Sequence, residues 1–284
     1  MSALLLGLLA ETSIHPGSGQ DDGVIDLPVQ REKTTCYPVI PGSSVKGGLR
    51  DYARQCRPAD STSPEDEHSD VIGWFGKQDS AGSILVGDAR LLLLPVRSLT
   101  GNYRWLTCPA LIERLQRDRR RAGLPDITAT NLKIAAGKVW TKTPDPSKKL
   151  FLEECSFEVT GSVPNHVITM IKDLIADGGA QERLENQIAV ISDDDFTWFA
   201  QNALSIQARN CLDADTKTSR NLWYEETLPP DTLFHCLLVP RTPTKAEAVD
   251  TLGRCFGKRP YLQLGGNETI GQGWFLVKTP SSKG

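Results

Sequence analysis

The sequence has 284 residues and a formal net charge of −3, with 39% hydrophobic and 24% charged residues. These values are ordinary for a globular protein and do not by themselves indicate nucleic-acid binding. The seven cysteines are single and form no C-x-x-C pair, so the sequence supports neither a zinc knuckle nor a disulfide framework. We therefore expect the protein in a reducing cytoplasm. The apolar "ALLLGLLA" near the N-terminus is too short to span a bilayer, so we expect no membrane association.

An apolar strand followed by a polar loop opens the chain. Residues 2–14 are rich in leucine, which predicts a buried strand, and residues 15–42 form a long loop punctuated by Gly, Pro and Asp. Carboxylates in such a loop suit a hard cation, and a histidine suits proton transfer. The spacing does not fit a calcium-binding loop, so capped and solvated turns are the alternative interpretation. The ionisable residues concerned are His15, Asp21, Asp22 and Asp26.

The segment from Ser43 to about Cys56 is predicted to be a helix, with Ser43 or Ser44 as its N-cap. Free N–H groups at a helix start favour a phosphate, and Gly47 in the first turns lets another backbone approach closely. Three cations fall on one face at i, i+4 and i+8, namely Lys46, Arg50 and Arg54. The pattern fits a phosphate-binding helix and equally a capped helix with an exposed basic face.

The middle of the chain contains one strongly basic stretch and patterns that predict several helices and strands. Between Tyr103 and Lys149 there are eleven lysines and arginines against four aspartates and glutamates. A polyanion responds to such a local field, although solvated helix faces are the alternative. In chain order we expect a polar insertion at 57–70, a strand pair or bent strand at 82–96, a helix at 106–123, a basic loop at 125–148, a strand at 149–163, an amphipathic helix at 165–179 that stops at two glycines, and a helix at 194–204.

A protruding hairpin is predicted at about 205–235. Two strand-like arms flank the polar tip "DADTKTS", and Trp223 and Tyr224 stand on one arm. Beside Arg209 and Arg220, these aromatic side chains are suited to enter between the bases of a nucleic acid. The alternative is a hairpin whose aromatic side chains pack on their own domain.

The C-terminal part combines two strands, a helix and a glycine-rich loop. We expect strands at 233–241 and 273–280, with a helix at 244–257 between them. The backbone N–H groups of the loop "QLGGNETIGQGW" are suited to face an anion or a nucleotide. No Lys-Ser or Lys-Thr follows as in a phosphate loop, so a tight turn explains the glycines equally well. The glycines are Gly265, Gly266, Gly271 and Gly273.

Strands and helices alternate irregularly along the chain, and no strand-to-helix turn carries a dinucleotide fingerprint. This pattern favours an α+β fold over a doubly wound sheet. We expect a ferredoxin-like, RRM-like core with large insertions and a thumb-like hairpin, all within a single domain over residues 1–284. The motifs G-x-S-x-G and H-E-x-x-H of common hydrolases are absent from the sequence.

Six blocks of the sequence, taken in order, carry a resemblance to a known family. They are "HPGSGQDDGVIDLPVQRE", "PVIPGSSVKGGLR", "GDARLLLLPVRSLTG", "WLTCP", "LWYEETLPPDTLF" and "LQLGGNETIGQGW". The resemblance extends over nearly the whole chain. The sequence resembles the RAMP superfamily of CRISPR proteins, and within it the repeated backbone subunit of type III-B (Cmr) effector complexes.

The resemblance implies an RNA-guided endoribonuclease built on an RRM-like, ferredoxin-type core. Copies of such a subunit stack in a filament along a guide CRISPR RNA, next to other Cmr complex subunits. A thumb hairpin from each copy displaces a guide nucleotide and kinks the duplex with a target single-stranded RNA. The target is then cut at regular intervals, in a reaction that needs Mg²⁺ or another divalent cation and leaves a cyclic phosphate.

The family's motifs also imply site residues. Its cleavage aspartate, in the context G-x-x-D-x-P-x-Q-R-E, corresponds to Asp26, as a metal ligand or as a base. Its guide-binding helix start, G-S-S-x-K-G, corresponds to Ser43, Ser44 and Lys46. Further catalytic candidates are His15, Tyr224, Glu225 and Glu226, although the histidine also fits a structural role. Further RNA-binding candidates are Gly47, Arg50, Arg54, Arg209, Arg220, Gly265, Gly266, Gly271 and Gly273.

The implied reaction needs no nucleophile from the protein, because RNA carries its own in the 2′-hydroxyl beside each phosphate. The protein has to hold that hydroxyl in line, help to remove its proton and neutralise the developing charge. Two alternatives stay open. One is a non-catalytic RNA-binding scaffold of the same kind of filament, in which Asp26 only caps its loop. The other is a free-standing metal hydrolase of small phosphoesters, against which the missing multi-ligand metal motif counts.

Overall fold

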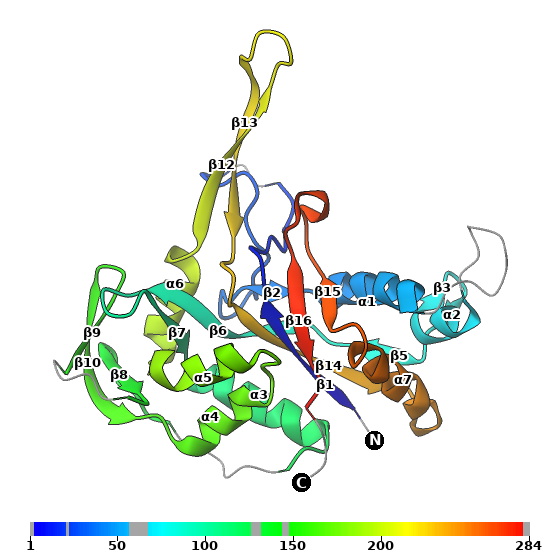
Figure 1. Ribbon diagram of the computed structural model, residues 1–284, viewed down its shortest axis with the longest axis horizontal. Coiled ribbons are helices and arrows are strands. Elements are labelled where there is room, and N and C mark those ends of the chain that lie inside the picture. The colour runs from blue at the N-terminus through cyan, green and yellow to red at the C-terminus, as the bar shows by residue number, and fades with distance from the viewer. Residues whose placement is uncertain (1–2, 21–22, 57–67, 126–131, 144–147, 281–284) are drawn as a thin grey trace.

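The computed structural model describes residues 3–20, 23–56, 68–125, 132–143 and 148–280. A large mixed sheet with flanking helices forms the body of the molecule, and a long hairpin stands away from it (Figure 1). None of the helices in these residues is long and apolar enough to cross a bilayer. Most of the polar insertion predicted at 57–70 lies outside the described residues.

A four-stranded antiparallel core lies in the middle of the sheet. Its elements are β1 (Leu4–Ala10), α1 (Gly42–Cys56), β6 (Ala89–Arg97), β14 (Leu233–Pro240), α7 (Ala246–Phe256) and β16 (Trp274–Lys278). The strands follow in the order β16, β1, β14, β6, and each pairs antiparallel with its neighbour. The connections β1–α1–β6 and β14–α7–β16 are two interleaved βαβ units, which is the ferredoxin-like arrangement. The predicted fold class is confirmed.

The central strand β1 is buried on both faces, which explains its unbroken apolar sequence. It is shorter than the predicted strand at 2–14. Gly7 within it leaves no room for a side chain, because a Cβ atom there would lie 2.0 Å from the carbonyl oxygen of Leu174. With β14 on one side and β16 on the other, β1 gives the long loop that follows it a fixed starting point.

The residues between β6 and β14 extend the sheet on one side. β7 (Tyr103–Thr107) pairs with β6, and Leu94 faces Leu106 across this junction. Beyond β7 the strands are β11 (Ile188–Ile191), β8 (Lys138–Thr141), β10 (Cys155–Ser162) and β9 (Lys149–Leu152), in that spatial order. The helices here are α3 (Pro109–Arg121), α4 (Asn165–Lys172), α5 (Gly178–Gln187) and α6 (Asp193–Asn202). Buried side chains of this region and of the core form one hydrophobic cluster.

Two predictions in this region are wrong. The helix expected at 165–179 ends at Lys172, and the glycines expected to stop it begin α5 instead. The reason is a cap, since the Asp177 carboxylate accepts from the N–H of Ala180 at 2.6 Å. The stretch 125–148 is not all loop, because β8 lies within it and obtains its hydrogen bonds from β10 and β11. Strands β7 and β11 are also missed by the sequence pattern.

Short elements surround the start of α1 and the edge of the sheet. They are β2 (Val39–Ile40), α2 (Ser69–Phe75), β3 (Gly76–Lys77), β4 (Ser80–Ala81), β5 (Ile84–Val86), η1 (Pro243–Lys245), β15 (Tyr261–Gln263) and η2 (Glu268–Ile270). β5 and β6 confirm the strand pair predicted at 82–96, although each of them pairs with β14. β15 lies at the sheet edge and pairs with β16.

The protruding hairpin consists of β12 (Ser205–Leu212) and β13 (Ser219–Thr227), joined by a polar tip. Most of its side chains are exposed, and it extends far beyond the sheet in Figure 1. The predicted hairpin is confirmed, but its predicted end at 235 is wrong. Leu228 already pairs with Ile14 at the sheet, and β14 begins at Leu233.

Candidate functional site

The loop after β1 is bound to the base of the hairpin through its backbone. Leu27 forms a parallel bridge with Glu225 of β13. The Leu27 N–H donates to the Tyr224 carbonyl at 3.1 Å, and the Leu27 carbonyl accepts from the Glu226 N–H at 3.0 Å. These bonds bring Asp26, the neighbour of Leu27, to the side of β13.

Asp26 lies at this junction with one carboxylate oxygen bound and the other open. Its Oδ2 accepts a hydrogen bond from the backbone N–H of Tyr224 at 2.7 Å, which fixes the direction of the carboxylate. Oδ1 has no hydrogen-bond partner among the residues that the structure describes, and the side chain is partly exposed. The carboxylate is thus oriented by the hairpin and still able to bind a proton or a cation.

Glu226, by contrast, is buried and has both carboxylate oxygens occupied. Oε2 accepts from the N–H of Val29 at 3.0 Å, and Oε1 accepts from Nη2 of Arg31 at 2.6 Å. The same guanidinium donates through Nη1 to the carbonyl groups of Cys36 (3.0 Å) and Ala200 (2.5 Å). A mostly buried ion pair with these extra hydrogen bonds holds the loop in place. Glu226 is therefore arranged to support the site.

Glu225 is also buried, and it links the hairpin to the glycine-rich loop. Its Oε2 accepts from Nη1 of Arg209 at 3.1 Å, and its Oε1 accepts from the side-chain amide of Asn267. The Arg209 guanidinium also lies over the Trp223 ring, 5.7 Å from the ring centroid. Arg209 is thus engaged in an ion pair and a cation–π contact at the hairpin base.

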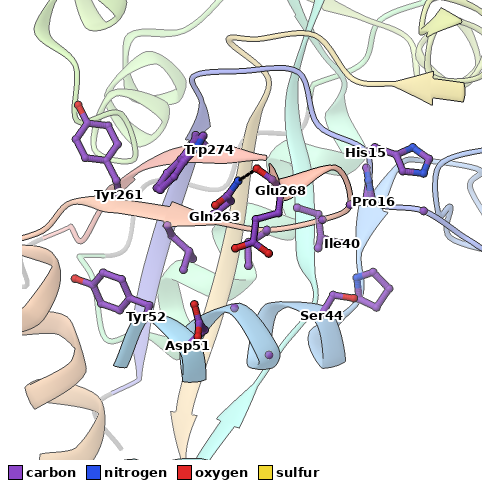
Figure 2. Close-up of a pocket in the computed structure, with 18 of the residues that line it drawn as sticks. His15, Pro16, Ile40, Ser44, Asp51, Tyr52, Tyr261, Gln263, Glu268 and Trp274 are labelled. Carbon is purple, nitrogen blue, oxygen red and sulfur yellow. Dashed lines mark hydrogen bonds between the residues drawn. The ribbon is translucent and has the colours of Figure 1, made fainter. Parts of the chain in front are cut away.

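His15 joins β13 to the glycine-rich loop, and only 7% of its surface is exposed. Its Nδ1 lies 2.8 Å from the carbonyl oxygen of Glu226. Because a carbonyl can only accept, Nδ1 carries a proton, and Nε2 of the neutral ring is left as an acceptor. The backbone carbonyl of His15 accepts from the N–H of Gly266 at 2.8 Å. In Figure 2 the imidazole lies at the margin of a cleft between α1 and the β15–β16 pair.

The glycine-rich loop has structural reasons for its glycines. Gly265 has a φ of 97°, and a Cβ atom there would lie 2.9 Å from the His15 carbonyl oxygen. Gly273 has a φ of 83° and donates its N–H to a carbonyl of the loop after β1 at 3.0 Å. The Gly266 N–H donates to the His15 carbonyl, and the Gly271 N–H donates to the Glu268 carbonyl at 3.0 Å. Three of the predicted anion donors are therefore bound within the protein. Gly271 has a φ of 82° and open space around it. The tight-turn interpretation accounts for this loop.

One face of the hairpin exposes apolar side chains. Tyr224 is 44% exposed, and Ile206 and Leu222 are each 54% exposed. Strand alternation and the pairing of Ala208 with Tyr224 place all of these on the same face. Trp223 points to the opposite face, under the guanidinium already described. Tyr224 is therefore exposed on one face of the hairpin.

The tip of the hairpin is stabilised by its own residues. Nε of Arg220 donates to Oδ2 of Asp213 at 2.9 Å. The backbone N–H groups of Thr216 and Asp215 donate to the other oxygen, each at 2.9 Å. These hydrogen bonds, with the Arg220 guanidinium, lower the pKa of Asp213 to about 2. The predicted RNA-binding residue Arg220 is thus paired in the free protein.

A cleft of about 1110 Å³ opens between α1 and the β15–β16 pair (Figure 2). Ser44 and Gly47 line it from α1, and the exposed aromatic side chains of Tyr261 and Trp274 line it from the strands. Gly48 lets the helix approach, because a Cβ atom there would lie 2.4 Å from a leucine side chain of the glycine-rich loop. The cleft is at least as large as sites that commonly hold small ligands.

The helix α1 begins at Gly42, before the serines predicted to cap it. The Gly42 N–H donates to Oδ1 of Asp88 at 2.7 Å, so a side chain from the turn between β5 and β6 satisfies the helix start. The predicted serine cap is therefore wrong, and Ser43 and Ser44 are exposed in the first turn. The basic residues that follow along α1 are Lys46, Arg50 and Arg54, and the first of these lines a pocket separate from the cleft.

The site offers a divalent cation a single carboxylate. Within the described ranges, no group of three or more His, Cys, Asp and Glu side chains could enclose a metal ion. Mg²⁺ is commonly held by one or two carboxylates and completes its shell with water and substrate phosphates. Asp26, with one open oxygen, fits a cation of that kind. Asp21 and Asp22 lie outside the described residues.

Comparison with known proteins agrees with this geometry. The chain matches the RAMP superfamily over residues 8–276 and belongs to that superfamily. It is 36% identical over 287 residues to the CRISPR system Cmr endoribonuclease Cmr4 of Pyrococcus furiosus, covering 98% of this chain and 95% of that protein. It is 25% identical to the CRISPR system CMR subunit Cmr4 of Saccharolobus solfataricus, covering 93% and 92%. The crystal structure of oligomeric Cmr4 from P. furiosus matches with a TM-score of 0.76 and 29% identity over 99% of each chain.

The predicted family is thus confirmed, but several residues that hold the site were missed. Arg31 stands in the Q-R-E motif and Asn267 stands between the loop glycines, so both carry a local signal. Their partners lie 195 and 42 positions away. Such pairings follow from the fold and cannot be read from spacing along the chain.

Proposed function

We propose that this protein is the repeated backbone subunit of a type III-B CRISPR effector complex, which binds guide RNA and cleaves complementary target RNA at regular intervals. The observation that carries the proposal is Asp26, a carboxylate oriented by the hairpin with one oxygen open to a ligand. A relative at 36% identity over nearly the whole chain is named as a Cmr endoribonuclease. This supports catalysis over a purely structural role.

The partners proposed are guide CRISPR RNA, target single-stranded RNA, further copies of the chain and other Cmr subunits. A similar solved structure is that of an oligomeric Cmr4. The hairpin projects beyond the sheet, where it is able to reach a neighbouring copy or an RNA duplex (Figure 1). The cysteines are all free thiols, which suits work in a reducing cytoplasm.

Cleavage is proposed to occur by attack of a target 2′-hydroxyl on its own neighbouring phosphorus. The 2′-oxygen loses its proton as the new O–P bond forms. The bond from phosphorus to the 5′-oxygen of the next nucleotide breaks, and that oxygen takes up a proton. The products are a 2′,3′-cyclic phosphate and a 5′-hydroxyl. The protein contributes in-line orientation and stabilisation of the developing charge.

The open Oδ1 of Asp26 is the group proposed to act at the reacting atoms, by accepting the 2′-hydroxyl proton or by holding a cation there. Where a divalent cation such as Mg²⁺ is bound, it would neutralise charge on the phosphate. Glu225 and Glu226 are proposed as positioning residues, because their oxygens are bound within the protein. His15, through Nε2, and Tyr224 are candidates for handling the second proton.

The alternative is a non-catalytic RNA-binding scaffold, which the hydrogen bond between Asp26 and the Tyr224 N–H also allows. The test is to assemble the complex with guide RNA and to incubate it with a labelled complementary target and with a non-complementary RNA. The proposal predicts guide-dependent products at regular spacing that end in a cyclic phosphate. Binding of the complementary target without any cleavage, with Mg²⁺ or Mn²⁺ present, would establish the scaffold instead.

A further inference from the structure

A second pocket, of about 610 Å³, lies beside α1 and is separate from the cleft. Lys46 lines this pocket, whereas Ser44, Gly48 and Asp51 line the cleft. At 100° per residue, Lys46 projects from the opposite face of the helix to those three residues. The start of α1 therefore separates two hollows of different character.

Three cations from three different elements line the second pocket. They are Lys46 of α1, Lys77 of β3 and Arg241, which follows β14. No side-chain hydrogen bond or ion pair joins any of them to another residue in the described part of the chain. One carboxylate, Asp79, also lines the pocket and leaves a local excess of positive charge. Like charges held close together repel, and an anion between them relieves that repulsion.

The backbone that carries these cations is well fixed. Lys77 pairs with Ser80 in the β3–β4 hairpin. Gly82, which closes that hairpin, packs so tightly that a Cβ atom there would lie 2.3 Å from a carbonyl oxygen of α2. The Arg241 N–H donates to the carbonyl of Ser83 at 2.8 Å, which ties the end of β14 to the same turn. The cations are thus flexible only through their side chains.

We infer that this pocket binds a phosphate of the guide RNA backbone, with Lys77 and Arg241 acting beside Lys46. The inference rests on the proposed function and adds two residues to it. A guanidinium binds two phosphate oxygens at once, and lysines add charge around the same group. Ser43, exposed in the first turn of α1, adds a hydroxyl close to Lys46 in sequence. A phosphodiester is favoured over an acidic protein segment, because three cations from separate elements line the same pocket.

The test measures binding of a fluorescein-labelled single-stranded RNA to the full chain by anisotropy over a series of salt concentrations. The variants are Lys77→Ala, Arg241→Ala and the double variant. Because the three cations share one phosphate, loss of that contact is expected to lower the magnitude of the slope of log K against log salt by at most about 0.7. The double variant should come close to this change, and each single variant should show a smaller one. The matched control is Lys278→Ala, at the last position of β16, which removes a charge outside the pocket and should leave the slope unchanged.

Each other outcome has a definite meaning. An unchanged slope in the double variant, together with a lowered slope in Lys46→Ala, would overturn the pocket proposal and leave the proposed function standing. Failure of the unaltered chain to bind RNA would count against the proposed function itself. If the double variant keeps the slope but loses self-association without RNA in sedimentation experiments, an acidic surface of another copy occupies the pocket, and the RNA assignment is wrong. A Lys77→Arg variant that keeps the slope of the unaltered chain, where Lys77→Ala lowers it, confirms that charge at this position matters.

Discussion

The base of the hairpin and the start of α1 differ in whether their charged side chains are paired. At the hairpin base, Glu225 is paired with Arg209 and Glu226 with Arg31. Both glutamates are buried, and both arginines are mostly shielded from solvent. At the start of α1, three cations face a pocket with no partner in the described part of the chain. The ion pairs at the hairpin base fix the position of the loop, whereas the unpaired cations beside α1 attract negative charge.

This difference separates two kinds of function. A reacting group needs orientation, and the paired network supplies it by holding the loop of Asp26 against β13. A binding surface for RNA needs unpaired cations, which release counterions from the backbone. Variants in the first region should therefore alter cleavage or folding, and variants in the second should alter affinity and its salt dependence.

The largest effect is expected for Asp26→Asn in the assembled complex. The amide keeps an acceptor for the Tyr224 N–H but can neither take a proton nor hold a cation well. Single-turnover cleavage of the target should fall by at least about 10²-fold, while target affinity stays the same. Asp250→Asn, on the exposed side of α7, is the matched control and should cleave normally. Cleavage by Asp26→Asn at the normal rate would remove Asp26 from the reaction.

Glu226→Gln should act on folding instead. The amide weakens the pairing with Arg31 and presents N–H groups where Arg31 and the Val29 N–H already donate. We expect the free energy of unfolding, measured by urea denaturation, to fall by about 2–3 kcal/mol. Asp26→Asn should change it by less than about 0.5 kcal/mol. An unchanged free energy of unfolding in Glu226→Gln would contradict the role of Glu226 in holding the loop after β1.

Lys46→Ala tests the other region. Guide RNA should bind several-fold more weakly at low salt, and the magnitude of the slope of log K against log salt should fall by up to about 0.7. Because Lys46 lines a pocket that does not include Asp26, the rate of cleavage at saturating guide and target should not change. A normal affinity and slope would exclude Lys46 from the phosphate contacts. Lys278→Ala serves again as the charge-matched comparison.

The smallest effect is expected at the hairpin tip. The folded pKa of Asp213 is lowered to about 2, so the carboxylate stabilises the tip above its usual pKa of 3.8 and loses this contribution as the pH falls through about 2. Carbon NMR of the Asp213 carboxyl group should show that low midpoint, and Arg220→Ala should raise it. A midpoint near 3.8 in the unaltered protein would mean that the tip is not ordered as described.

The fold could be predicted from the sequence because local residue patterns indicate several of the core elements. The apolar run of β1 and the helical spacing of α1 and α7 are visible in the letters themselves. It failed where a distant partner decides the local structure. β8 exists because β10 and β11 supply its hydrogen bonds, and α1 starts at Gly42 because Asp88 caps it.

The same distinction applies to the site. Asp26 was found through the motif that surrounds it, and so was the glycine-rich loop. The motif singled out Asp26, and Glu225 and Glu226 were further candidates because they are carboxylates beside Tyr224. Only the fold shows that the two glutamates are buried and paired while Asp26 keeps an open oxygen.

The most direct test is a structure of the assembled complex with guide RNA and a target that lacks the 2′-hydroxyl at the cleavage positions, which prevents the reaction. The account predicts that the Asp26 carboxylate, still bound to β13, lies within about 3–4 Å of the sugar 2′ position or of the adjacent phosphate, directly or through a cation. A well-ordered target whose sugar-phosphate linkages all lie far from this carboxylate would contradict it.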